Sequence, residues 1–178
     1  LASVLPEQAD SEISEQEMIR RNNEELVAAW GNLVQRVFAQ INNNFDKLGD
    51  ISDSEEIDTK LIFGFEEAYK NIGNLIEKVE LKSALQESMR CVSQVNAYLN
   101  ETEPWKIIKD DTKRAGRVLY TSLQAIDSCA NLLYPFMPAT SENVRNAIPK
   151  TTECKWGVNE IKRGVELGQL ELLFKKFD

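Results

Sequence analysis

The sequence predicts an all-α protein folded as an antiparallel bundle of helices. Apolar residues recur at three- and four-residue intervals over most of the chain, which is the spacing of one face of a helix. No segment alternates apolar and polar residues as a half-buried strand would, and no repeat of about 20–50 residues is visible. The polar breaks between the periodic segments are short, and short connections join helices that run in opposite directions.

The first helix is expected to begin at Ser14, after a proline-broken stretch over residues 1–13. Ser14 and Glu17 have the spacing of a capping box, in which each side chain satisfies a backbone amide at the helix start. The helix is expected to end in the amide- and glycine-containing segment INNNFDKLGD, residues 41–50. Its apolar face consists of Leu26, Trp30, Leu33, Val37, Ile41 and Phe45. Trp30 lies on this face, and we therefore expect it in the core.

Two more helices are expected over the central part of the chain. The segment SDSEE, residues 52–56, supplies capping side chains and acids that suit a helix N-terminus. The apolar face of the helix that follows consists of Leu61, Phe65, Ile72, Leu75, Ile76 and Val79. After a tight turn, the apolar face of the third helix consists of Leu81, Leu85, Met89, Val92, Val95 and Leu99.

Prolines mark the limits of the remaining helices. Pro104 suits the first position of a fourth helix, where a backbone N–H would be unpaired in any case. This helix is expected to resume over residues 113–134 and to end at Pro135, since proline breaks a helix interior. A short fifth helix is expected over TSENVRNAI, residues 140–148, before Pro149.

The composition suits one soluble domain in a reducing compartment. The chain has 178 residues, of which 42% are hydrophobic and 28% are charged. No run of 18 or more apolar residues occurs, so no membrane span is expected, and no secretory leader is recognised. Three widely spaced cysteines, an odd number, favour a reducing cytosol over a disulfide framework or a zinc site.

The residue types present argue against catalysis by this chain alone. The sequence has no histidine, which excludes Ser-His-Asp and Cys-His catalysis and histidine-ligated metals. It also has no glycine-rich phosphate loop and no paired catalytic cysteines, so we expect no catalytic residue, metal or cofactor here. The formal net charge of −8 disfavours DNA and non-specific nucleic-acid binding. A small local RNA site is compatible with it, because charges interact over roughly 8 Å at physiological salt.

Asn32 and Arg36 are candidate RNA-contacting residues on the first helix. They are four residues apart and so stand one turn apart on one face. By helical periodicity, both point roughly 100–140° away from the mean direction of the apolar face. Asparagine offers a donor and an acceptor and arginine offers a planar fork, which together can read a base edge. A solvated helix face is the simpler interpretation of the spacing alone.

Trp105 is the second candidate, in YLNETEPWK, residues 98–106, where a polar break separates two helical stretches. At a helix start it would offer a flat apolar face on which a base stacks with about 1–3 kcal/mol. The helix N-terminus beside it presents unpaired N–H groups to a base or phosphate. The alternative is a tryptophan that covers the end of the bundle. A basic cluster further along is interpreted as a solvated face; it consists of Lys113, Arg114 and Arg117.

Three segments in this order and spacing resemble the anticodon-binding domain of methionyl-tRNA synthetases: RRNNEELVAAWGNLVQRVF, VNAYLNETEPWK and NLLYPFMPATSENV. The opening LASVLPEQADSEISEQEMIRRNNEEL is similar to the end of the stem-contact region that precedes that domain. The resemblance implies a bundle of the class I aminoacyl-tRNA synthetase anticodon-binding type. It further implies a preceding-region tail over residues 1–20, the bundle over 21–150, and an irregular segment over 151–178 that packs back on it.

The family reads the anticodon CAU, and the resemblance implies the role of each matching residue. Trp105 would stack on the cytosine at the first anticodon position, and Asn32 and Arg36 would contact the anticodon from the facing helix. The residues implied to support this site are Asn96, Pro104 and Lys109. Two positions depart from the family pattern: Asn100 stands where Asp is common, and Gln35 replaces a more usual Asn.

The resemblance also implies that this chain is a C-terminal part of a cytoplasmic methionine–tRNA ligase. The upstream domain would attach methionine to tRNA(Met) using ATP and Mg²⁺. Its adenylate-forming motifs, His-Ile-Gly-His and Lys-Met-Ser-Lys-Ser, are absent here. One alternative is the anticodon-binding domain of another class I synthetase, for isoleucine, valine, leucine or cysteine. The other is a helical module that binds a protein through its acidic surface.

Overall fold

The computed structural model describes residues 14–151 and 154–177, and within these ranges it is helical without a strand. The elements are α1 (Glu15–Arg21), the π-helix η2 (Asn22–Gly31), α2 (Asn32–Asn44), α3 (Glu56–Glu77), α4 (Leu81–Thr102), α5 (Pro104–Ile107), α6 (Thr112–Leu133) and α7 (Pro138–Ala147). The predicted all-α bundle is confirmed.

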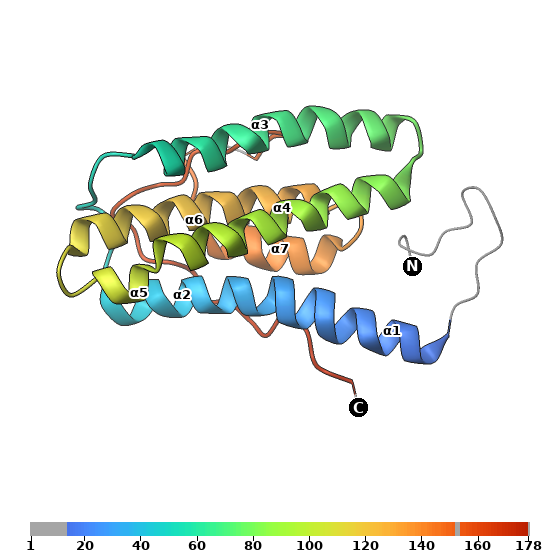
Figure 1. Ribbon diagram of the computed structural model, residues 1–178, viewed down its shortest axis with the longest axis horizontal. Helices are drawn as coiled ribbons and strands as arrows, with labels where there is room; N and C mark the ends of the chain where they lie inside the picture. The colour runs from blue at the N-terminus through green and yellow to red at the C-terminus, as the bar shows by residue number, and fades with distance from the viewer. Residues whose placement is uncertain (1–13, 152–153, 178) are drawn as a thin grey trace.

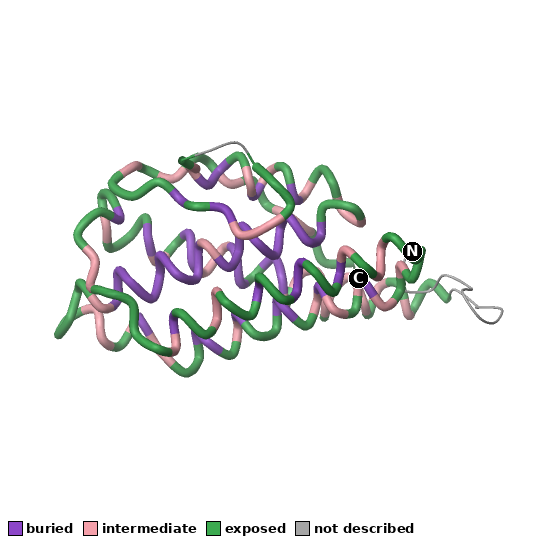
Figure 2. The backbone as a smooth tube through the Cα atoms, turned by 90° about the horizontal axis from the view of Figure 1, so that it is seen from above, coloured by how far each residue is buried: buried purple, intermediate pink, exposed green. Residues whose placement is uncertain are grey.

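The helices pack around α6, as Figure 1 shows. The continuous rod of α1, η2 and α2 lies on one side, α3 lies on the opposite side, and α4 runs between them. Helix α6 contacts α2, α3, α4, α5 and α7. From Ala115 to Leu133 every residue of α6 except Gln124 is buried, and Figure 2 shows the buried positions concentrated along the middle of the molecule. Trp30 is 0% exposed, so its predicted place in the core is confirmed.

Local capping explains where the first and third α-helices begin. The Ser14 hydroxyl accepts a hydrogen bond from the Glu17 amide at 3.1 Å, as predicted, but the Glu17 carboxylate accepts from Arg20 and Arg21. A complete capping box forms instead at the start of α3, where the Glu55 amide donates to Asp58 at 2.8 Å. The acids of SDSEE therefore act as predicted, as a helix start.

One residue assigned to an apolar face lies outside the core. Val79 is 69% exposed because it lies in the turn between α3 and α4, after the last helical residue Glu77. Its φ of 62° is in the left-handed region, which is unfavourable for a β-branched side chain. The apolar periodicity predicted a helix that continues to Val79, but the tight turn ends α3 two residues earlier, at Glu77.

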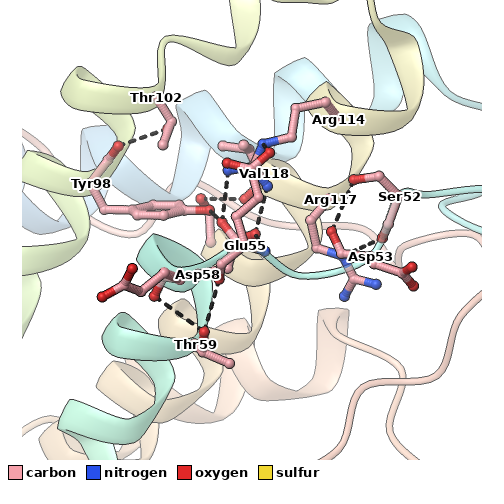
Figure 3. A network of polar contacts seen from close by, with 12 residues as sticks. Ser52, Asp53, Glu55, Asp58, Thr59, Tyr98, Thr102, Arg114, Arg117 and Val118 are labelled. Atoms are coloured by element: carbon pink, nitrogen blue, oxygen red, sulfur yellow. Dashed lines mark hydrogen bonds and ion pairs between the residues drawn. The ribbon is translucent and has the colours of Figure 1, made fainter.

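The interpretation of the basic cluster as a solvated face is wrong for two of its three residues. The Arg117 side chain is buried, and its Nε donates to the Ser52 carbonyl at 2.7 Å. The Arg114 side chain is 13% exposed and pairs with Asp58 and Glu55 (Figure 3). The loop between α2 and α3 folds over the start of α6. It covers a face of α6 that the periodicity alone predicts to be exposed to solvent. Only Lys113 stays exposed, paired with Asp50.

In its described residues, 148–151 and 154–177, the segment after α7 has no helix and runs along the bundle, as the red trace in Figure 1 shows. The Gly168 amide donates to the Ala147 carbonyl at 2.8 Å, and a Cβ at Gly168 would lie 3.0 Å from the Ala147 Cα. Further on, the Asn22 side chain donates to the Lys175 carbonyl at 2.9 Å. The segment is therefore attached by hydrogen bonds to both α7 and η2.

Neither a metal cluster nor a membrane span is found in the described part of the chain. No group of three or more carboxylates and cysteines is placed to hold a metal ion there. No helix formed by residues 14–151 and 154–177 combines the length and the apolar character needed to cross a membrane.

Candidate nucleic-acid interface

The Arg36 and Trp105 side chains are in contact, and Figure 1 shows that their helices, α2 and α5, lie beside each other. The guanidinium carbon of Arg36 lies 5.7 Å from the centre of the Trp105 ring, which is within cation–π distance. Trp105 is partly buried and packs against the edge of the core. It therefore combines the two interpretations drawn from the sequence, because it covers part of the bundle and keeps part of its surface accessible.

Asn96 connects this pair to the first helix. Its side-chain oxygen accepts from Arg36 Nη2 at 3.2 Å, while its amide nitrogen donates to the Ala29 carbonyl at 3.1 Å and the Val92 carbonyl at 3.2 Å. Two carbonyl acceptors on the nitrogen orient the amide, so the oxygen faces Arg36. The guanidinium thus contacts both Asn96, through a hydrogen bond, and the Trp105 ring.

The Arg36 guanidinium keeps free hydrogen-bonding capacity. Its Nε is buried and has no partner in the described part of the chain. Partial burial lowers the pKa of Arg36 from its ordinary value of 12.5. An arginine remains protonated in proteins despite such a shift. Among the residues that the structure describes, Arg36 forms no salt bridge, so its positive charge suits a ligand that carries acceptor oxygens or nitrogens.

The turn before Trp105 is built from adjacent residues. Glu103 ends α4 with φ 41° and ψ 57°, in the left-handed region, and Pro104 begins α5 as predicted. The Lys106 ammonium lies 2.7 Å from the Glu103 carboxylate across this turn. Pro104 is buried, and its ring limits φ at the start of α5. The chain therefore reverses sharply and directs the next residue towards α2.

The remaining predicted residues lie at the edges of this arrangement. Asn32 is exposed one turn before Arg36, and Lys109 is exposed in the turn that follows α5. Neither side chain has a recorded hydrogen bond or ion pair within residues 14–151 and 154–177. The fold thus brings Arg36 into contact with both Asn96 and Trp105, and it leaves Asn32 and Lys109 open to solvent.

The π-helix η2 was not predicted, and it affects the orientation of the site. The Asn32 amide donates to the Val27 carbonyl, five residues back, so the helix is wider here than an α-helix. This widening changes the rotation of α2 relative to α1, whereas the prediction assumed one uniform period. The Ala29 carbonyl near the end of η2 accepts the Asn96 amide. Nothing in the segment NNEELVAAWG signals a π-helix.

A second group of residues missed by sequence reasoning joins the start of α3, the end of α4 and the start of α6 (Figure 3). The buried Asp58 carboxylate of α3 accepts from the Tyr98 hydroxyl of α4 and from Arg114 Nη1 of α6, the latter at 2.5 Å. Burial alone would raise the pKa of Asp58, but the hydrogen bonds from Arg114 and Tyr98 outweigh it and lower that pKa. Burial and the neighbouring carboxylate raise the pKa of Tyr98. We refer to Asp58, Tyr98 and Arg114 as the Asp58 network.

Comparison with protein families gives matches over nearly the whole chain. The model described as the anticodon binding domain of methionyl tRNA ligase matches residues 49–178. The model described as tRNA synthetases class I (M) matches residues 1–38.

Individual relatives agree with the family match. The methionine–tRNA ligase of Bifidobacterium adolescentis is 43% identical over 148 residues, which are 82% of this chain and 24% of that protein. The methionine–tRNA ligase of Chloroflexus aurantiacus is 38% identical over 139 residues, 78% of this chain and 23% of that protein. The chain thus spans about a quarter of the length of these curated relatives.

Solved structures show the same fold. The apo form of Mycobacterium tuberculosis methionyl-tRNA synthetase matches with a TM-score of 0.89 at 20% identity, covering 99% of this chain and 37% of that one. The same enzyme bound by methionyl-adenylate matches with a TM-score of 0.87 over 96% of this chain and 35% of that one.

Proposed function

The chain belongs to the anticodon-binding domain family of methionyl-tRNA ligases, and we propose that it reads the CAU anticodon of tRNA(Met) within a longer methionine–tRNA ligase. The observation that carries the proposal is the placement of Arg36 against both Asn96 and Trp105 between α2 and α5. A charged donor beside a partly exposed indole suits one unstacked base, which is how proteins read single-stranded RNA loops.

In this proposal Trp105 binds the cytosine at the first anticodon position by stacking. Stacking contributes about 1–3 kcal/mol and accepts any base, so selection for cytosine comes from hydrogen bonds to the base edge. Arg36 donates to the acceptors of that edge through guanidinium N–H groups that Asn96 does not occupy, and Asn32 supplies an acceptor for the exocyclic amine. Because Asn96 already holds the guanidinium, Arg36 loses little freedom when the base binds.

The two supporting residues Pro104 and Lys109 act on the Trp105 indole and on the RNA backbone, respectively. Pro104 restricts the backbone before Trp105, so the indole is positioned in advance of binding. Lys109 is exposed beyond α5 and supplies a charge for a neighbouring phosphate. With a net charge of −8, the domain attracts RNA weakly at long range, so affinity depends on these few contacts.

The remaining activity belongs to the polypeptide outside this chain. We propose that an upstream catalytic domain forms methionyl-adenylate from ATP with Mg²⁺ and transfers methionine to the tRNA, in the cytoplasm. Residues 1–20 would be the end of the region that leads into this domain, residues 21–150 the anticodon-binding bundle, and residues 151–178 its C-terminal covering segment.

Tryptophan fluorescence tests the proposal directly. The chain is titrated with an RNA stem-loop that bears CAU and with the same loop bearing GAU. Quenching by the CAU loop alone is expected, because only cytosine satisfies the hydrogen bonds beside the stacking face. Since Trp30 and Trp156 also fluoresce, Trp105→Phe is measured in parallel and should lose the response. Equal quenching by both loops, or a response that persists in Trp105→Phe, would contradict anticodon reading by this residue.

A further inference from the structure

An open groove runs between the first half of α3 and the second half of α4, on the other side of α4 from α2. Its volume is about 740 Å³. Its apolar lining includes Leu61 and Phe63 of α3 and Ala97 of α4. Gly64, next to Phe63 on α3, also lines the groove. The Phe63 side chain is 62% exposed. We refer to this feature as the α3–α4 groove.

Gly64 is not explained by packing within the chain. It lies in the interior of α3, where glycine costs roughly 0.5–1 kcal/mol relative to alanine. A Cβ at Gly64 would meet no atom of residues 14–151 and 154–177 within 4 Å, whereas one at Gly73 of the same helix would lie 3.3 Å from the Trp156 indole nitrogen. A side chain at Gly73 would therefore press against Trp156. Gly64 instead leaves the groove open at a cost in helix stability.

The rim of the groove has an excess of negative charge. Glu56, Glu67 and Glu101 are exposed, and no ion pair of their side chains is found in the described part of the chain. Lys60 is the cation among the lining residues, and Glu55 at the end of the groove already pairs with Arg114. Such a rim repels phosphates and attracts a positively charged ligand.

We propose that the α3–α4 groove docks a short cationic amphipathic segment of a partner protein. A large apolar side chain of the segment lies over Gly64 beside Phe63, and its lysines or arginines lie between Glu67 and Glu101. From Glu56 to Glu67, α3 is about 18 Å long, which is enough for about three turns of a bound helix.

The location of the groove argues against two other occupants. RNA is disfavoured by the carboxylates, and the proposed anticodon site faces α2, on the other side of α4 (Figure 1). The family model for the class I synthetase matches residues 1–38, and α1 lies at the far end of the bundle from the start of α3. The preceding part of a ligase would therefore join at the opposite end, which favours a separate protein as the partner.

The test uses the full chain and a designed peptide of about 12 residues, long enough for three turns, in which leucines form one face and lysines the other. Amide chemical shifts are followed by NMR. Saturable shifts centred on Phe63 and Gly64 are expected with the leucine–lysine peptide. A peptide with glutamates in place of the lysines, and one with serines in place of the leucines, should give none at the same concentration.

Variants of the chain separate docking in the groove from general attraction to an acidic protein. Glu67→Lys should weaken the peptide about tenfold, whereas Glu66→Lys, an equal charge change on the neighbouring face of α3, should have little effect. Gly64→Leu should fill the groove and abolish binding without lowering the melting temperature. Trp105→Ala should leave peptide binding unchanged, so failure of anticodon reading would not affect this result.

Three outcomes would overturn the proposal. Equal loss of affinity in Glu66→Lys and Glu67→Lys would mean attraction by net charge alone. Binding that survives Gly64→Leu would place the peptide elsewhere. Self-association of the chain in sedimentation, lost in Gly64→Leu, would assign the groove to a second copy of the chain.

Discussion

At the scale of single residues, Asp58 shows how a buried charge stabilises the place where the ends of α3, α4 and α6 meet. Asp58 is 1% exposed, and its carboxylate accepts hydrogen bonds from Arg114 and Tyr98 (Figure 3). Breaking a buried pair by removing one partner typically costs about 3–5 kcal/mol, because the remaining charge is left without compensation. Glu55 also contacts Arg114, so the loss here should lie near the lower limit.

We therefore expect Asp58→Asn to lower the free energy of unfolding by about 3 kcal/mol near neutral pH. The folded-state pKa of Asp58 lies below its ordinary value of 3.8, so its stabilisation is present above that value. It is lost as pH falls through the lowered folded-state pKa. Urea unfolding at neutral and acidic pH measures both effects. Asp53→Asn, at an exposed position, is the control; a difference that persists undiminished in acid would contradict the role of the charge.

At the scale of elements, the connections decide where side chains point. Two turns place residues other than glycine in the left-handed region, Val79 between α3 and α4 and Glu103 between α4 and α5. The unfavourable backbone conformation of Glu103 is offset by its ion pair with Lys106, across the turn that directs Trp105 towards α2. Val79 is exposed and β-branched, and its side chain contributes little to the core.

Val79→Gly is expected to stabilise the protein by about 1 kcal/mol, because glycine adopts positive φ without a steric penalty. Thermal unfolding monitored by circular dichroism measures the change. Lys78→Gly is the matched control, since Lys78 has a φ of −82° and gains nothing from glycine. If both variants were destabilised equally, strain at Val79 would not be the cause.

At the scale of the whole molecule, the net charge of −8 limits how the domain can bind RNA. Each phosphate contact to a single strand adds about −0.7 to the slope of log K against log salt. The proposed site offers Lys109 as its exposed phosphate contact, beside the partly buried Arg36.

The slope for the CAU stem-loop is therefore expected to be shallow, no steeper than about −2. Lys109→Ala should reduce its magnitude by about 0.7, and Lys78→Ala, at the other end of α3 from the site, should leave it unchanged. Fluorescence titrations at several salt concentrations measure the slope. A slope of about −4 or steeper would show a broad phosphate-binding surface that the charge distribution does not predict.

The helices and the family were predictable from the sequence because they depend on local signals. Three- and four-residue apolar spacing, the Ser14 cap and Pro104 each act within a few residues, and each was confirmed. The motif-based resemblance was confirmed by the family match over residues 49–178. The roles of the anticodon residues were inferred from the same resemblance and remain predictions.

Contacts between distant segments required the folded structure. Arg36 and Asn96 are 60 residues apart, and Asp58 and Arg114 are 56 apart, so no local pattern pairs them. The same holds for Arg117. Helical periodicity predicted an exposed side chain, but the loop before α3 covers it. The π-helix η2 packs against α4, which lies outside its own ten residues, and no pattern within those residues indicates it. Local patterns determine which segments form helices, whereas burial and pairing are decided by the neighbours that packing brings together.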